Sequence, residues 1–310
     1  MIRFVEAILA STLDFAPSVV LAALGGVISE RSGVVNLGLE GMMRLGAFFA
    51  AVATLSTGSP WLGLGAGMLA AAAAALVHGY LSIRWRSDQV VSGIALNLVA
   101  LGGVTFLVEA LYGRTDTEPS AALGKVIIPG IEGVPFLRAF SNHSWLAWCA
   151  LLAPVLMHLL LYRTALGLRI LAVGEKPQAA ATLGIRVNRL RYGCVIASGL
   201  LAGLGGASLS VSTLNQFNNH MPAGQGFMAL AAMVFGKWTP LGAFGAGLFF
   251  AAANALRISL ASSLPWVSDV VPSGFLLALP YALTQVLLAG FVGRARAPAA
   301  DGVPYDPELR

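Results

Sequence analysis

The chain has 310 residues, of which 57% are hydrophobic and only 11% are charged. Soluble domains carry about 25% charged residues, so the composition excludes an ordinary soluble fold and indicates an all-α, polytopic helical membrane protein. The 36 glycines fit this class, because small residues let membrane helices approach closely. We interpret the net charge of +5 as an asymmetry between the two sides of a membrane, and we expect no nucleic-acid partner.

The first apolar stretch is interrupted by polar residues. Asp14 and Pro17 follow an apolar segment at residues 2–13, and another apolar segment runs on to residue 28. A helix needs about 20 apolar residues to cross a bilayer. Either one tilted span covers residues 4–28, which we favour, or residues 2–13 lie flat at the membrane interface.

Residues 30–44 form a glycine-rich segment that is too polar for a lipid-facing helix and too apolar for an ordinary loop. Irregular backbone at membrane depth is tolerated only where protein or a water-filled cavity surrounds it. The segment therefore predicts a broken helix that faces a translocation path. The simpler alternative is a turn on the cytoplasmic side.

Further apolar segments predict most of the remaining spans, at residues 45–55, 61–83, 90–111, 145–162, 192–214, 241–258 and 275–291, with a short one at 226–235. The expected number is eight to ten, with nine as the best estimate and the N-terminus outside. Gly199, Gly203 and Gly206 fall on one face and predict tight helix packing. Residues 1–292 then form the membrane domain, and the polar tail at 293–310 is predicted to be disordered.

The most polar segment inside the apolar chain runs from Arg163 to Tyr192 and carries six cations and one anion, Glu175. Lys and Arg resist translocation, so this loop and the C-terminus are expected in the cytoplasm. Pro177 suits the first turn of a helix and Gly184 suits the position just past its end. These signals predict a short helix near residues 177–183. Because two turns are unstable alone, it needs a surface to rest on, unless it is only a solvated connector.

No pattern of an enzyme is present. The chain contains no GxxxxGK[ST] phosphate-binding loop, no HExxH and no GxSxG. Its four histidines are scattered, and Cys149 and Cys194 both fall in predicted spans. We therefore expect no enzymatic activity, no metal site and no cofactor bound by this chain.

Polar residues inside the predicted spans are the better clue to function, because they are costly in lipid and tend to face a cavity. Their amides and carboxylate can hydrogen-bond a hydroxylated or nucleobase-bearing solute, or they can simply join helices. The candidate pathway residues are Asn36, Glu40, Asn97, Gln216, Gln225 and Asn254.

Three separated motifs carry a resemblance that spans about residues 20–290. They are GGVISERSGVVNLGLEGMMRLGAF from Gly25, GEKPQAAATLGIRVNRLRY followed by SGLLAGLGGA, and AGQGFMALAAMVFGKWTPLGA from Ala223. The chain resembles the permease subunits of bacterial ABC importers, in the ribose-permease-like branch that includes nucleoside-type permeases. Relatives often have Arg at the position of Gln225 and Asn at that of Lys176, so charge-based roles there do not carry over.

The resemblance implies a multi-pass protein of the bacterial cytoplasmic (inner) membrane. It also implies three protein partners: an ABC ATPase subunit that binds the ATP, a second, homologous permease chain, and an external substrate-binding lipoprotein. The segment implied to dock on the ATPase comprises Gly174, Glu175, Lys176, Ala179, Ala180, Gly184 and Ile185.

The cargo is less specified than the family. Nucleosides are favoured, followed by simple sugars such as ribose and then by riboflavin-like compounds. An ion-coupled secondary transporter is an alternative of another class, for which Glu40 is the one plausible coupling carboxylate. A membrane scaffold is a third, although it gives the polar segment at residues 30–44 no purpose.

Overall fold

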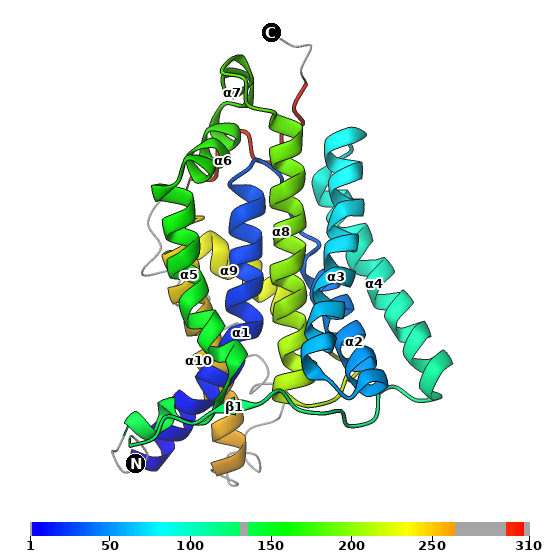
Figure 1. Ribbon diagram of the computed structural model, residues 1–310, viewed down its shortest axis with the longest axis vertical. Helices are drawn as coiled ribbons and strands as arrows, with labels where there is room; N and C mark the ends of the chain where they lie inside the picture. The colour runs from blue at the N-terminus through cyan, green and yellow to red at the C-terminus, as the bar shows by residue number, and fades with distance from the viewer. Residues whose placement is uncertain (1, 131–135, 264–295, 307–310) are drawn as a thin grey trace.

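The computed structural model describes residues 2–130, 136–263 and 296–306, which are mostly helical (Figure 1). The α-helices are α1 (Ile2–Glu30), α2 (Leu39–Thr57), α3 (Pro60–Gly79), α4 (Gln89–Tyr112), α5 (Trp145–Arg163), α6 (Ala165–Glu175), α7 (Pro177–Thr182), α8 (Val187–Ser208), α9 (Gln225–Phe235) and α10 (Pro240–Ser263). Shorter elements are the π-helical turns η1 (Tyr80–Arg84) and η3 (Leu209–Thr213), the 3-10 turn η2 (Leu137–Phe140), and the antiparallel strands β1 (Lys125–Val126) and β2 (His143–Ser144).

Seven helices in the described part of the chain are long and apolar enough to cross a membrane, with lengths of 19 to 27 residues. The protein is therefore a polytopic helical membrane protein, as the sequence predicts. The estimate of nine spans is not matched among the described residues. Helix α9 has only 11 residues, about half of what a bilayer requires. The span expected at 275–291 lies outside the described residues.

Helix α1 is one continuous span, which agrees with the tilted-span interpretation and not with a flat N-terminal segment. Two of its acidic residues, Glu6 and Asp14, are held by the loop before α5. Glu6 accepts a hydrogen bond of 2.8 Å from Arg138, and Asp14 lies 2.8 Å from Nδ1 of His143. Pairing in this way lets both carboxylates lie in an otherwise apolar helix.

Local sequence explains several helix ends. The Asp88 carboxylate accepts hydrogen bonds from the backbone of Val90 and Val91 and so begins α4. The Thr164 hydroxyl likewise accepts a hydrogen bond from the Gly167 N–H and so begins α6. Gly58 ends α2 in the left-handed conformation that glycine adopts without steric cost.

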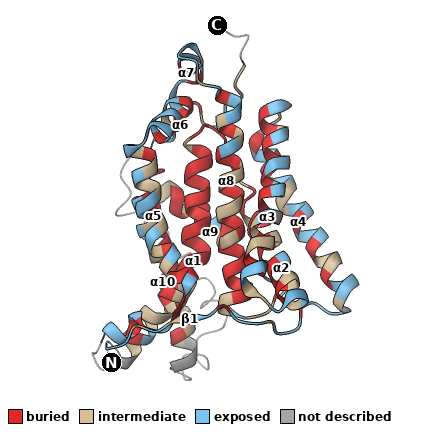
Figure 2. Ribbon diagram, in the orientation of Figure 1, coloured by how far each residue is buried: buried red, intermediate tan, exposed pale blue. Residues whose placement is uncertain are grey.

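Helices α1 and α8 occupy the buried centre of the bundle, and Figure 2 shows them as largely buried ribbons. Glycines make the close packing around α8 possible. A Cβ atom on Gly203 would lie 2.6 Å from Cβ of Ala71, and one on Gly46 would lie 2.5 Å from the Gly203 carbonyl oxygen. Similar close approaches occur at Gly199 and Gly206, so the predicted small-residue face is confirmed as the contact of α8 with α2 and α3.

The two ends of the bundle differ in charge. We call the end that carries α6, α7, the α3–α4 corner and residues 296–306 the basic end (Figure 1). Arg86 in that corner pairs with Asp306, and Arg31 donates to the carbonyl groups of Lys237 and Trp238. The N-terminus and the β1–β2 pair lie at the opposite end. The predicted clustering of cations on one side is therefore seen among the described residues.

The described part of the C-terminal tail, residues 296–306, differs from the disorder predicted for 293–310. The backbone N–H of Ala300 donates to the Gly174 carbonyl over 2.9 Å, and Arg191 donates to the Val303 carbonyl over 3.1 Å. Most of these contacts use backbone atoms and residues far away in the chain. Composition alone cannot reveal such contacts, which is why the sequence favours disorder.

The glycine contacts give a first test of the fold. We expect Gly203→Val to lower the free energy of unfolding by about 1–3 kcal/mol, because the added atoms overpack the α3–α8 contact. Gly102→Val on α4 is the matched control, since a Cβ there meets nothing within 4 Å. Thermal unfolding in detergent measures both. Equal melting temperatures for the two variants would contradict the packing.

Candidate functional site

The helical structure is interrupted between α1 and α2. Residues 31–38, which we call the break, are irregular but largely buried. Protein groups satisfy its backbone. The Ser29 hydroxyl donates to the Val34 carbonyl over 2.7 Å, and the Val35 N–H donates to the Gln89 side chain over 2.7 Å. The predicted broken segment is therefore present. Asn36 reaches Ser198 in the middle of α8, so the break is not a turn at the surface.

Two of the predicted pathway residues hold the break in place. Asn36 donates to the Ser198 hydroxyl over 2.9 Å and accepts from the Gly38 N–H. Asn97 on α4 donates to the Leu37 carbonyl and accepts from the Gly41 N–H, both over 2.8 Å. These amide groups are engaged with the chain itself. Their first role is thus to position the break.

Glu40 joins the start of α2 to the start of α9. One carboxylate oxygen accepts from the Gly224 N–H over 2.8 Å, and the other accepts from the Gly226 N–H over 2.7 Å. The carboxylate so caps a helix N-terminus, where negative charge is favoured. A Cβ on Gly226 would lie 2.5 Å from the Glu40 backbone, so only glycine allows this approach. Two helix starts that meet inside a membrane bundle are typical of substrate sites in transporters.

The remaining pathway candidates differ in where they lie. Gln225 accepts a hydrogen bond from Ser18 on α1 and so joins the group around Glu40. Asn254 instead accepts from Arg257 within α10, and Gln216 lies half-buried in the segment before α9. Among the described residues, no hydrogen bond connects Asn254 or Gln216 with the other four candidates.

Sequence reasoning missed three contributors to this site, Ser198, Arg44 and Asn219. Arg44 donates to the Asn219 carbonyl over 2.7 Å, and its charge lies near the Glu40 carboxylate. Arg44 follows Glu40 by four residues, which places both on one face of a helix. That spacing of opposite charges inside an apolar span was the available signal.

The second candidate region is the pair α6–α7 at the basic end. The predicted helix at 177–183 is observed at Pro177–Thr182, with Pro177 in its first turn. Gly184 follows at φ +81°, a conformation that glycine adopts readily. Helix α6 was not predicted. Its signals were the capping residue Thr164 and the spacing of the buried residues Ile170 and Val173.

The residues predicted to dock on an ATPase divide into two faces. Gly174 and Ala180 are buried, and a Cβ on Gly174 would lie 2.2 Å from the Arg31 carbonyl oxygen. The end of α6 therefore rests directly on the break. Ile185 is half-buried. The members of the set that are exposed are Glu175, Lys176, Ala179 and Gly184.

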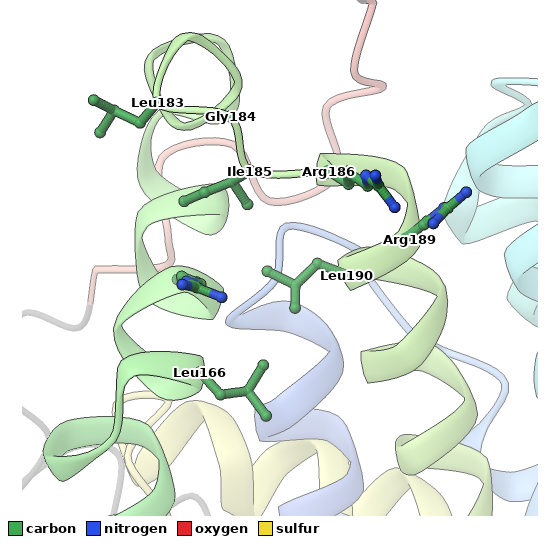
Figure 3. Close-up of a pocket in the computed structure, with 8 residues that line it drawn as sticks. Leu166, Leu183, Gly184, Ile185, Arg186, Arg189 and Leu190 are labelled. Atoms are coloured by element: carbon green, nitrogen blue, oxygen red, sulfur yellow. The ribbon is translucent and has the colours of Figure 1, made fainter.

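A cavity of about 530 Å³ lies between α6 and the start of α8 (Figure 3). Figure 3 shows Leu166, Ile185 and Leu190 around it, with Arg186 and Arg189 on the α8 side. Arg169 and Leu183 also line the cavity, and the Leu183 side chain is 82% exposed. An apolar hollow bordered by arginines suits a protein partner that brings an apolar anchor and acidic groups.

A comparison with protein families matches residues 8–280 to the permease component of branched-chain amino acid transport systems. The chain belongs to this permease family. It is 44% identical to the guanosine ABC transporter permease protein NupQ of Bacillus subtilis and 37% identical to the nucleoside ABC transporter permease protein NupC of Lactococcus lactis, over 98% of each chain. It is 38% identical to the putative glucose ABC transporter permease protein TsgC13 of Haloferax volcanii, over 82% of this permease and 78% of the relative.

The Glu40 contact predicts a defined stability effect in the permease. Glu40→Gln replaces one acceptor oxygen with an NH2 group that faces a backbone donor, so we expect a loss of about 1–3 kcal/mol in the free energy of unfolding. Glu109→Gln, on the exposed end of α4, is the control. Chemical unfolding in detergent reports both, and an unchanged midpoint for Glu40→Gln would show that the carboxylate does not hold α9.

Proposed function

We propose that this chain is the membrane-spanning permease subunit of an ATP-driven importer and that its cargo is a nucleoside. The observation that carries the proposal is the near full-length similarity to two relatives whose names state guanosine and nucleoside transport. The same family description applies to most of the chain. A glucose permease among the relatives keeps simple sugars as the second candidate cargo.

In this proposal the basic end faces the cytoplasm of a bacterium, because Lys and Arg are retained on that side. The N-terminus is then outside, and residues 296–306 are inside. The cavity between α6 and α8 and the exposed residues of α7 receive the ATPase, which binds the ATP. A second, homologous permease chain completes the pathway, and an external binding protein delivers the cargo.

The contact between Gly174 and Arg31 supports a mechanism for the coupling. Movement of the ATPase displaces α6 and α7 as one body, since α7 is too short to move independently. The end of α6 transmits the displacement to the break, and the break shifts the starts of α2 and α9. We propose that Gln216 and Asn254 face the pathway, while Asn36 and Asn97 keep the break in position and Glu40 and Gln225 hold the start of α9.

The geometry disfavours ion coupling through Glu40. Both of its oxygens accept backbone hydrogen bonds at the start of α9, so the carboxylate is committed to the fold. An ion-coupling carboxylate has to exchange its ligand in every transport cycle. The broken segment has a purpose in a transporter and none in a scaffold.

Reconstitution tests the class of transporter. We expect vesicles that contain the permease, its ATPase, the second permease chain and the binding protein to take up nucleosides when ATP is supplied. Uptake is measured with radiolabelled guanosine, with excess glucose as a competitor to test the second cargo. Uptake that follows a proton or sodium gradient and ignores ATP would contradict the proposal.

We call residues 174–185, which the resemblance implies to dock on the ATPase, the coupling segment. Substitutions in it test its role. We expect Gly184→Pro to abolish uptake without loss of the folded protein, because proline cannot adopt φ +81° and removes the N–H that donates to Ala181. Glu175→Arg should also abolish uptake, by reversing an exposed charge on the docking face. Glu109→Arg at the opposite end of the bundle is the control. Normal uptake by both coupling variants would remove this segment from the mechanism.

A further inference from the structure

Residues 296–306 begin their contacts at the end of α6. The Ala300 N–H donates to the Gly174 carbonyl over 2.9 Å, and the Ala299 N–H donates to the Glu175 carboxylate over 3.4 Å. Both acceptors belong to the predicted coupling segment. Tyr305, further along, packs beside the cluster formed by Val173, Ala180 and Val187. The C-terminal segment is therefore attached to both α6 and α7, which we call the coupling helices.

The middle of the segment lies against the break. Arg191 links the two, since its Nε donates to the Ser32 carbonyl and its Nη1 donates to the Val303 carbonyl, both over 3.1 Å. The Asp301 carboxyl lies beside that of Glu30 at the end of α1. A Cβ on Gly33 would lie 3.0 Å from the Ala300 carbonyl oxygen. The break is thus enclosed between the coupling helices and the C-terminal segment.

The far end of the segment is anchored on the α3–α4 corner. The Arg86 guanidinium makes two hydrogen bonds, of 2.7 Å and 3.1 Å, with the Asp306 carboxylate. A two-point contact of this kind fixes direction as well as distance. Eleven residues consequently connect α6, the break and the α3–α4 corner.

A buried cation, Arg191, lies beside the segment. Arg191 is only 1% exposed, and Asp301 is the acidic group of the segment whose charge lies near it. Burial raises the pKa of the Asp301 carboxyl to about 7, although the neighbouring Glu30 and the charge of Arg191 oppose that rise. The hydrogen bonds that Arg191 donates to the Ser32 and Val303 carbonyls are the contacts that join the segment to this buried cation.

We propose that residues 296–306 are a tie that makes α6–α7, the break and the α3–α4 corner move together during transport. This inference rests on the proposed function, because the role of the tie is to carry movement from the ATPase to the pathway. Without it, the displacement of α6 reaches the break through the contact of Gly174 with Arg31, and it is only partly transmitted. Asp301 and Asp306 are positioning residues in this device.

The physical connection is tested without ATP. Spin labels at Leu183→Cys and Trp85→Cys, both at exposed positions, report the distance between α7 and the α3–α4 corner in the full chain with Cys149 and Cys194 replaced. We expect Asp306→Arg to broaden the distance distribution and the exchanged pair Arg86→Asp with Asp306→Arg to narrow it again. An unchanged distribution in Asp306→Arg would overturn the tie.

Transmission is tested in the assembled transporter. We expect Asp306→Arg to reduce nucleoside uptake per ATP hydrolysed by about fivefold, the shift that an exposed ion pair can cause, and the exchanged pair to restore it. Asp301→Ala should reduce the same ratio by a similar factor, because the Asp301 carboxyl lies near Glu30 of α1 and Arg191 of α8. The control is Glu118→Arg, which breaks the exposed Arg114–Glu118 pair away from the tie and should change nothing.

The outcomes separate the two proposals. A ratio that stays unchanged in Asp306→Arg and Asp301→Ala, even with lower protein levels, would reduce residues 296–306 to packing and overturn the tie. Failure of the exchanged pair to restore the ratio would overturn it as well. ATP-independent uptake by the unmodified chain would instead contradict the proposed function, and the spin labels then decide whether the segment joins these elements.

Discussion

The structure depends on satisfying the backbone of residues 31–38 inside an apolar bundle. Each buried N–H or carbonyl group that lacks a partner costs several kcal/mol in a membrane. The chain meets this cost with side chains from other elements, among them Gln89, Asn97 and Arg191. Polar residues in the spans are thus explained first by the needs of the break. Close glycine packing of α8 against α2 and α3 supplies the frame that holds them.

The break also connects the two regions of functional interest. On one side Glu40 ties the start of α2 to that of α9, and on the other Gly174 of α6 lies against Arg31. In the proposed mechanism, a displacement of α6 and α7 therefore reaches the helix starts through a few residues in direct contact. Packed elements of this kind move between discrete arrangements, which is what a transport cycle requires.

Much of this architecture could be predicted from the sequence, and the failures have physical causes. Long apolar segments identify spans because the bilayer thickness fixes their length, and Pro177 with Gly184 located α7 because their backbone preferences are strong. The roles of Asn36 and Asn97 could not be predicted, since each binds a group far away in the chain, the Ser198 hydroxyl for Asn36 and the Leu37 carbonyl for Asn97. Helix α6 and the contacts of residues 296–306 were missed for related reasons: α6 lay inside a segment interpreted as a basic loop, and the tail binds through its backbone.

Backbone hydrogen exchange of the assembled transporter tests the central claim most directly, because it reports residues 31–38 and the coupling helices in one experiment. The account predicts that the amides of the break are protected before nucleotide is added. It also predicts that a non-hydrolysable ATP analogue changes exchange in the break and in residues 165–185 together. Fast exchange of the break in the resting transporter, or a change confined to residues 165–185, would contradict it.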